Sequence, residues 1–170
     1  MKTNIYLWTG NGAGKTTSAL GVALRCAGQK KKAVIIQFMK GRKDIGEYKI
    51  RNKLKPYYEI HQFGTRQFIN LKKPSCKDIE NAYKGLVFAV QKAKNKPFIM
   101  IFDEINLAAA IGLLKIDDVV KAVKQISKNT IVYLTGRKAP RQLISLADFV
   151  NEIREVKKPR KYPARKGIEY

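Results

Sequence analysis

The sequence predicts an α/β fold, with a mainly parallel β-sheet and helices on both of its faces. Short unbroken apolar runs such as Ala33–Phe38 and Phe98–Phe102 are typical of strands that are buried on both sides. Segments whose apolar residues recur at helical spacing separate these runs along the chain. Strands that alternate with helices in this way form parallel sheets, so the pattern points to a layered α/β domain.

The first part of the chain forms one βαβ unit. A β-rich run, Asn4–Thr9, ends directly in glycines. The helical spacing then predicts a helix from Thr16 to Ala27, with Gly28 as its stop, and the strand at Ala33–Phe38 follows. The apolar stripe predicted for this helix consists of Ala19, Leu20, Ala23, Leu24 and Ala27.

The middle of the chain begins with irregular sequence over residues 39–73, which includes a short predicted strand at Tyr57–Gln62. Ser75 begins the next helix, because Asp78 stands three residues later in the position of a capping box. The buried stripe predicted for this helix consists of Ile79, Tyr83, Leu86, Val87 and Val90.

The last third of the chain continues the alternation. The strand at Phe98–Phe102 ends in two acidic residues, and Asp117 is predicted to cap the helix that follows. The buried residues of that helix would be Val119, Val120, Val123 and Ile126. The remaining predicted elements are a strand at Thr130–Leu134, a short helix over about 140–147 and a strand at Phe149–Val156.

Composition excludes several classes of protein. The chain of 170 residues is 45% hydrophobic and 9% aromatic, too rich for a disordered chain. Its apolar runs are far shorter than the about 20 residues that span a bilayer. The first strand leaves no room for a signal peptide, so we expect a cytoplasmic protein. Two cysteines, Cys26 and Cys76, are too few for a disulfide scaffold, and a single histidine, His61, argues against a histidine-ligated zinc site.

The predicted domain organisation is a single α/β domain over residues 1–156 and a basic tail over residues 157–170. The net charge of +22 has three explanations: binding to nucleic acid, a cleft for a polyanionic small ligand, or the composition of a thermophilic host. Charge alone does not choose among them. The tail is either a solvated terminus or an arm that packs on or over an anionic site, and we expect the second.

The glycine loop between the first strand and the first helix is typical of a phosphate-binding loop. Glycines let backbone N–H groups approach phosphate oxygens, and the start of a helix is favourable for an anion. The lysine of the loop adds a full positive charge, and the hydroxyl after it can ligate Mg²⁺. We therefore expect this P-loop to bind a nucleoside triphosphate, although Thr9 stands where the usual first glycine would be. Its predicted binding residues are Gly10, Asn11, Gly12, Ala13, Gly14, Lys15, Thr16 and Thr17.

The acidic pair Asp103–Glu104 follows a buried strand at its carboxyl end, where open α/β sheets place their ligands. Such acids often only cap a following helix. Together with the P-loop, however, they predict a Mg²⁺ site formed by Thr16, Glu104 and Asp103, with Mn²⁺ as an alternative ion. Lys15, Thr16 and Glu104 are then the predicted catalytic residues.

Five segments in this order resemble the ATP:corrinoid adenosyltransferases of the phosphate-loop type, over nearly the whole chain. The glycine loop alone is shared with many NTPases, whereas the ordered set is much more specific. The segments are Gly10–Thr17, Gln37–Gly41, Asp103–Glu104, Thr135–Arg137 and Gly167–Tyr170.

The resemblance implies a P-loop NTPase-type, RecA-like fold and transfer of the 5′-deoxyadenosyl group of ATP to the Co(I) of a reduced corrinoid, with triphosphate as the leaving group. It implies that Arg25 lies near the nucleotide. The sequence leaves the electron donor open, with a reductase as one candidate partner, and we expect a homodimer. The residues expected on the corrinoid side are Gln37, Lys40, Gly41, Phe68, Thr135, Gly136 and Arg137.

Two alternative functions remain open from the residues themselves. An ordinary P-loop NTPase or small-molecule kinase would break the bond to the γ-phosphate and leave ADP. A basic nucleic-acid-binding ATPase would bind with an affinity that falls steeply with salt, but the chain has no recognisable motif for binding RNA or DNA. The reaction that the resemblance implies requires no protein base or covalent nucleophile, because Co(I) is itself a strong nucleophile. His61 is accordingly expected to be a strand residue, and both cysteines plain thiols.

Overall fold

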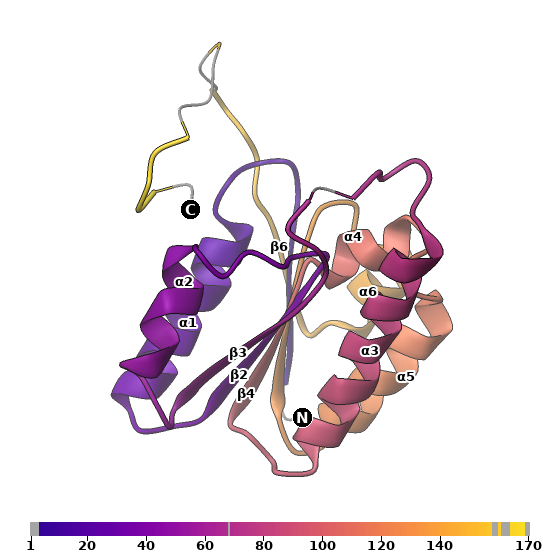
Figure 1. Ribbon diagram of the computed structural model, residues 1–170. Helices are drawn as coiled ribbons and strands as arrows, with labels where there is room; N and C mark the ends of the chain where they lie inside the picture. Colours follow the sequence, from indigo (N-terminus) through magenta and orange to yellow (C-terminus); the bar gives the residue numbers. More distant parts are fainter. Residues whose placement is uncertain (1–3, 68, 158–159, 161–163, 169–170) are drawn as a thin grey trace.

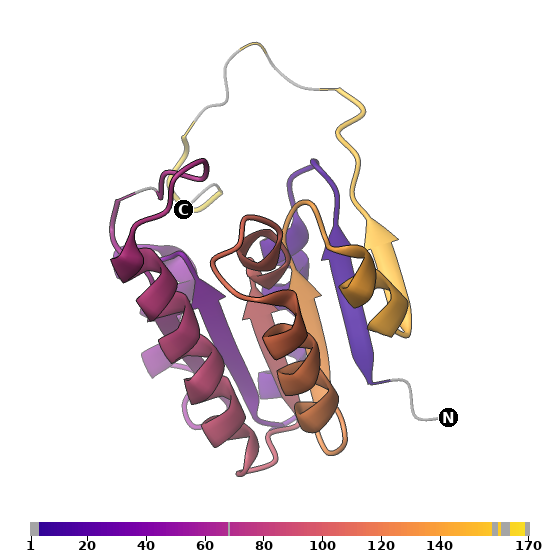
Figure 2. The same cartoon turned by 90° about the vertical axis from the view of Figure 1, so that its right-hand side faces the viewer.

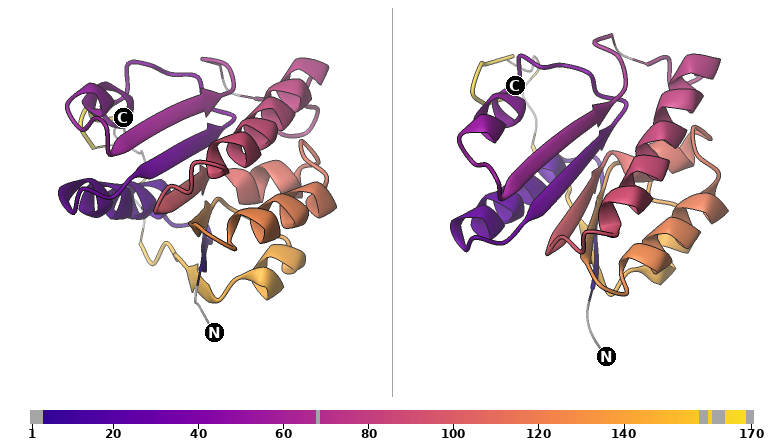
Figure 3. Two further views of the ribbon diagram at one scale, coloured as in Figure 1. Left: turned by 90° about the horizontal axis from the view of Figure 1, so that it is seen from below. Right: turned by 60° about the horizontal axis from the view of Figure 1, so that its bottom comes forward.

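The computed structural model describes residues 4–67, 69–157, 160 and 164–168. Six parallel strands form one sheet in the order β3-β2-β4-β5-β1-β6. Helices α1 and α2 cover one face, and α3, α4, α5 and α6 cover the other (Figures 1 and 2). Seen from below, the sheet lies between these two helical layers (Figure 3). The predicted α/β fold of the P-loop, RecA-like type is therefore confirmed.

The strands are β1 (Ile5–Thr9), β2 (Ala33–Phe38), β3 (Tyr58–Phe63), β4 (Ile99–Asp103), β5 (Ile131–Thr135) and β6 (Phe149–Glu152). The helices are α1 (Lys15–Gly28), α2 (Gly46–Lys49), α3 (Cys76–Ala93), α4 (Ile105–Ala110), α5 (Ile116–Ile126) and α6 (Arg141–Leu146), and a 3₁₀ turn (Ile50–Asn52) follows α2. Every predicted strand and helix is present. The sequence missed the short helices α2 and α4, which lie beside the candidate site.

Helix α3 confirms the predicted capping box, because Ser75 and Asp78 bond each other's backbone N–H groups. Its predicted stripe is wrong in part, since Ile79 and Val87 are exposed. Small residues bury instead, among them Ala82 and Ala89. The reason is close packing on the sheet: an added Cβ at Gly85 would lie 3.0 Å from the rings of both Phe38 and Phe63.

Three further predictions need correction. Leu24 in α1 is exposed, and Cys26 is buried in its place. Helix α5 begins at Ile116, so Asp117 lies in its first turn and caps nothing. Strand β6 ends at Glu152 because its partner β1 ends at Thr9, and Ile153 is hydrogen bonded to Thr9 and to Gly12 of the glycine loop.

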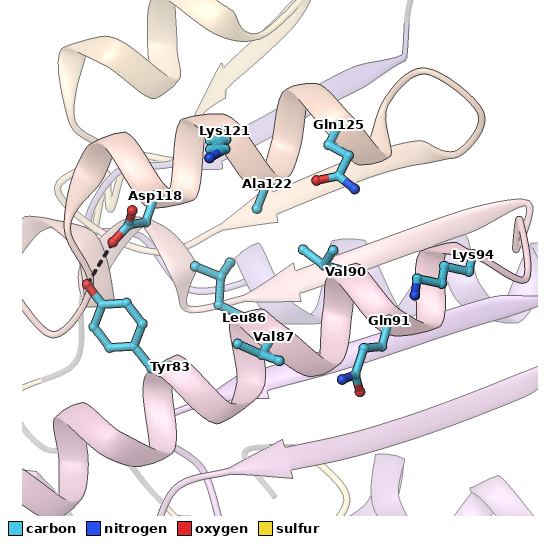
Figure 4. Close-up of a pocket in the computed structure, with 10 residues that line it drawn as sticks. All are labelled: Tyr83, Leu86, Val87, Val90, Gln91, Lys94, Asp118, Lys121, Ala122 and Gln125. Atoms are coloured by element: carbon cyan, nitrogen blue, oxygen red, sulfur yellow. Dashed lines mark hydrogen bonds between the residues drawn. The ribbon is translucent and has the colours of Figure 1, made fainter.

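Helices α3 and α5 pack side by side and leave a groove of about 410 Å³ between them (Figure 4). Leu86, Val87 and Val90 form its apolar floor, and a hydrogen bond from Tyr83 to Asp118 closes one end. This groove shares no lining residue with the loops that follow the strands.

Among the described residues, no helix combines the length and apolar character needed to cross a lipid bilayer.

Candidate functional site

The glycine loop connects β1 to α1 and is shaped by close backbone packing. Gly10 and Gly14 have φ angles of 95° and 105°, which residues with a side chain rarely adopt. An added Cβ at Gly10 would lie 2.3 Å from the carbonyl oxygen of Ile153, and the Gly12 N–H donates to the same oxygen at 2.9 Å. The segment after β6 therefore holds the loop from outside.

Lys15 is the first residue of α1 and is only 6% exposed. Its ammonium donates to the carbonyl oxygen of Gly12, across the curve of the loop. Burial lowers the pKa of Lys15, the charge of Arg137 lowers it further, and Glu104 raises it. Lys15, Arg137 and Glu104 thus lie close enough to interact near the start of α1. Two positive charges suit an anionic ligand there, and the carboxylate suits a cation bound to that ligand.

A polar row crosses four strands at their carboxyl ends and consists of Gln62, Gln37, Asp103 and Thr135. Parallel pairing places Gln62 beside Gln37 and Gln37 beside Asp103, while Thr135 follows the pair Phe102–Leu134. Neighbours in the row are hydrogen bonded: Gln62 donates to Gln37 at 2.9 Å, and Gln37 donates to Asp103 at 3.0 Å. Thr135 donates to the other oxygen of Asp103 at 2.8 Å.

Asp103 is the centre of this network and is 1% exposed. The Thr16 hydroxyl donates to its Oδ1 at 2.7 Å, and the Lys40 ammonium donates to its Oδ2 at 2.7 Å. Burial alone would raise the pKa of Asp103, but the charge of Lys40 and the donated hydrogen bonds hold it below its usual value. Asp103 is therefore an ionised carboxylate that links β4 to the P-loop.

Glu104 has a different environment, although it is the next residue. Its φ of 66° is left-handed, so the chain leaves the strand there, and α4 begins at the following residue. Its backbone N–H donates to the Thr135 hydroxyl at 3.1 Å. Its Oε2 is buried without a hydrogen-bond partner in the described part of the chain. Burial raises the pKa of Glu104, and the neighbouring charge of Asp103 adds to this effect.

These oxygens fit the predicted Mg²⁺ site. Mg²⁺ prefers oxygen ligands and keeps several waters beside one or two carboxylates and substrate phosphates. The unpartnered Glu104 Oε2 is such a carboxylate oxygen, and Thr16 adds a hydroxyl. Within the described residues, no three His, Cys, Asp or Glu side chains gather as a self-sufficient metal cage. The donor set thus suits an ion that arrives with a nucleotide.

Two residues expected on the corrinoid side have buried side chains instead. Gln37 and Thr135 are both 0% exposed, and their side chains donate hydrogen bonds to Asp103 within the polar row. The register of the parallel sheet turns both side chains toward the acid, and their expected place on the corrinoid side stays a prediction. Lys40 likewise reaches Asp103 and, at 3.4 Å, the Thr16 hydroxyl.

The glycines of the other two segments allow close approach of loops. An added Cβ at Gly41 would lie 2.6 Å from the backbone of Thr65, and one at Gly136 would lie 3.0 Å from the backbone of Leu107. Gly136 also has a φ of 134°. These glycines pack loops together at the edge of the site, whereas Arg137 is exposed there.

Arg25, which was predicted to lie near the nucleotide, is distant from the glycine loop. Arg25 lies on the surface in the last turn of α1, about 15 Å along the helix axis from Lys15, where its charge acts on Tyr133. Phe68 lies outside the described residues. The expected strand role of His61 is confirmed, since it lies in β3, its Nε2 is 3.4 Å from the acceptor oxygen Oε2 of Glu59, and its ring packs on Phe88.

The C-terminal segment reaches the site from above. Gly167 and Ile168 line a cavity of about 340 Å³. The other lining residues come from the P-loop helix, the segment after β2 and α2, and are Thr16, Thr17, Leu20, Lys40, Gly46 and Glu47. In Figure 1 this part of the chain returns over the carboxyl edge of the sheet toward α1 and α2.

Sequence reasoning missed Gln62 and Asn106. Asn106 is fully buried, and its side-chain N–H groups donate to the carbonyl oxygens of Trp8 and Gly136 at 3.1 and 3.2 Å, which ties β1 to the loop after β5. The available signal for Gln62 was its position as the last residue of a predicted strand. Asn106 gave no comparable signal, because it is buried in a helix that the sequence did not predict.

Comparison with known proteins gives one consistent result. A family model described as ATP:corrinoid adenosyltransferase BtuR/CobO/CobP matches residues 1–170. The chain is 32% identical over 159 residues to the corrinoid adenosyltransferase of Escherichia coli (strain K12), which covers 90% of this chain and 77% of that protein. It is 30% identical over 169 residues to the corrinoid adenosyltransferase of Pseudomonas aeruginosa, covering 98% of this chain and 83% of that protein. The chain therefore belongs to the ATP:corrinoid adenosyltransferase family.

Proposed function

We propose that this chain transfers the 5′-deoxyadenosyl group of ATP to the Co(I) of a reduced corrinoid and releases triphosphate. Membership of the family supports ATP-dependent adenosyl transfer in cobalamin biosynthesis or salvage and does not favour the NTPase, kinase or nucleic-acid alternatives. The observation that carries the proposal is the junction of Thr16, Asp103 and Glu104 beneath the glycine loop.

The reaction itself places few demands on protein side chains. The electron pair of Co(I) forms the bond to C5′ of the ribose, while the bond from C5′ to the triphosphate oxygen breaks and its electrons stay on the leaving group. The chain must align C5′ with cobalt and stabilise the departing charge. No proton needs to be removed, which agrees with a site whose central side chains are a lysine, a threonine and two carboxylates.

We assign the following roles within this proposal. The loop residues Gly10–Thr17 would hold the triphosphate through backbone N–H groups, with Lys15 and Arg137 as cationic neighbours of the leaving group. Thr16 and Glu104 would ligate Mg²⁺, or Mn²⁺ in its place. When bound, the ion would neutralise charge on the triphosphate.

We further propose that residues 157–170 pack over this site, because Gly167 and Ile168 line the cavity beside Thr16. The Co(I) state requires a reductant, so an electron-donating reductase is proposed as a partner. The predicted homodimer and cytoplasmic location stay predictions.

An anaerobic assay tests the proposal. The protein is mixed with ATP, Mg²⁺ and chemically reduced corrinoid, and the absorbance of Co(I) is followed. We expect this signal to disappear as a light-sensitive alkyl-cobalt product and triphosphate form. Persistence of Co(I) while ATP becomes ADP would instead support an NTPase or kinase.

A variant links the reaction to the glycine loop. Lys15→Ala removes the buried cation of the loop and should abolish triphosphate release. Lys43→Ala is the matched control, because Lys43 is an exposed lysine outside the site. Near-normal turnover of the Lys15 variant would refute the assignment of the site.

A further inference from the structure

The ammonium of Lys40 lies against Thr16, which the proposed function assigns to the metal site, and against the Asp103 carboxylate bonded to Thr16. Lys40 Nζ is 2.7 Å from Asp103 Oδ2 and 3.4 Å from Thr16 Oγ1. The first contact is an ion pair in which the Asp103 side chain is 1% exposed and the Lys40 side chain 29%. A positive charge therefore already occupies the surroundings of the two groups beside which a divalent cation would bind.

The hydrogen-bonding capacity of Asp103 shows why this matters. A carboxylate offers about four lone-pair sites. The hydroxyls of Thr16 and Thr135 donate to Oδ1, while Gln37 and Lys40 donate to Oδ2. The carboxylate is thus fully used, and a cation can gain access to it only if one of these donors leaves.

Lys40 is the donor that can leave. Gln37 and Thr135 are 0% exposed and fixed in strands, and Thr16 belongs to the first turn of α1. Lys40 has a long flexible side chain on the segment after β2. It also carries a full positive charge, which repels a divalent cation at the same oxygens.

The surroundings of Lys40 allow its side chain to move away from Asp103 while its backbone stays in place. The backbone on either side of Lys40 is held, because the Met39 N–H donates to the Phe63 carbonyl at 3.0 Å and Gly41 packs against the backbone of Thr65. The side chain itself borders the cavity of about 340 Å³ that Thr17 and Glu47 also line. The charge of Glu47 already acts favourably on the Lys40 ammonium.

We propose that Lys40 is an exchangeable counter-ion: it neutralises Asp103 while no metal is bound, and its ammonium turns into the cavity when a divalent cation binds. The inference rests on the proposed nucleotide and metal site, but not on the adenosyl transfer. Lys40 is accordingly a positioning residue, which keeps Thr16 and Asp103 in place for the ion and sets the affinity of the site for it.

Metal affinity tests this directly. Mn²⁺ is titrated into protein saturated with a non-hydrolysable ATP analogue, without corrinoid, and free Mn²⁺ is measured by electron paramagnetic resonance. Lys40→Met removes the competing charge and should bind Mn²⁺ at least about tenfold more tightly than the unaltered chain. Lys43→Met removes the same charge from an exposed position of the same segment and should leave the affinity unchanged.

A second variant protects the test against loss of the fold. Lys40→Gln keeps an amide donor for Asp103 but carries no charge, so it should also bind Mn²⁺ more tightly. In EDTA without nucleotide, both Lys40 variants should melt at a lower temperature than the unaltered chain, because Asp103 loses its counter-ion. A purely structural lysine would lower the melting temperature without tightening metal binding.

Unchanged or weaker Mn²⁺ binding in both Lys40 variants would overturn the proposal. The outcome is separate from that of the proposed function. Tighter Mn²⁺ binding in a protein that transfers no adenosyl group would refute only the proposed reaction. Adenosyl transfer with unchanged Mn²⁺ affinity would refute only the role of Lys40.

Discussion

Thr135→Val tests whether the hydrogen bonds of the polar row around Asp103 contribute to the free energy of unfolding. The Thr135 side chain is 0% exposed, and its hydroxyl takes part in two hydrogen bonds. It donates to Asp103 Oδ1 at 2.8 Å and accepts from the Glu104 backbone N–H at 3.1 Å. Valine has nearly the same shape as threonine, so the substitution removes both bonds and leaves little other change.

The expected cost follows from these two bonds. Loss of a hydrogen bond to a charged group costs about 1.5–3 kcal/mol, and a buried N–H left without a partner costs about 1–3 kcal/mol. The free energy of unfolding should therefore fall by about 4 kcal/mol. With a urea dependence of about 2–3 kcal/mol per M, the unfolding midpoint should move down by about 1.5 M.

Thr130→Val is the matched control, measured in the same urea titration. Thr130 lies just before β5, is 2% exposed, and its hydroxyl is buried with no hydrogen-bond partner among the described residues. Removing an unsatisfied buried hydroxyl should leave the stability unchanged or raise it by about 1 kcal/mol. Equal losses in the Thr130 and Thr135 variants would show that the row contributes no more than ordinary packing, and would refute the reasoning.

Two further changes probe the acids. Glu104→Gln should raise the Mg²⁺ concentration needed for half-maximal turnover by about tenfold, and an unchanged Mg²⁺ titration would remove Glu104 from the ligand set. Burial raises the pKa of Glu59, but Lys32 and Lys92 outweigh burial and lower it to about 2. Since this lies below the ordinary value of 4.5, the stabilisation is complete above that pH and is lost as pH falls toward 2. Glu59→Gln should thus flatten the decline of melting temperature below about pH 5, and parallel curves for the two proteins would contradict this.

If Lys40 competes with a metal ion, substitutions of Lys40 and of Glu104 should change the metal affinity of the site in opposite directions. Removing the charge of Lys40 is expected to tighten metal binding, whereas removing that of Glu104 is expected to weaken it. Both side chains lie within the same electrostatic network, because each affects the pKa of the other. A general loss of structure would weaken binding in both variants, so the pair of measurements separates electrostatics from misfolding.

Local sequence pattern was sufficient to predict those elements that depend only on neighbouring residues. The apolar runs predict the central strands β2 and β4, since a strand buried on both faces must be continuously apolar. The glycines, Lys15 and Thr16 predict the phosphate loop, because backbone approach and helix start are properties of adjacent residues. The capping box at Ser75 is equally local. Errors arose where packing against the sheet decides burial, as at Ile79 and Val87.

The contacts among the polar residues at the ends of the strands depend on how the chain folds in three dimensions. Strand β5 lies between β1 and β4, so Thr135 stands beside Asp103, although 32 positions separate them in the chain. The register of β2 against β4 places Gln37 next to the same carboxylate. Strand order and register arise from contacts between distant segments, which no local spacing encodes. Strand order and register made Asp103 a buried carboxylate with four donors, whereas one oxygen of Glu104, its neighbour in the chain, has no hydrogen-bond partner among the residues that the structure describes.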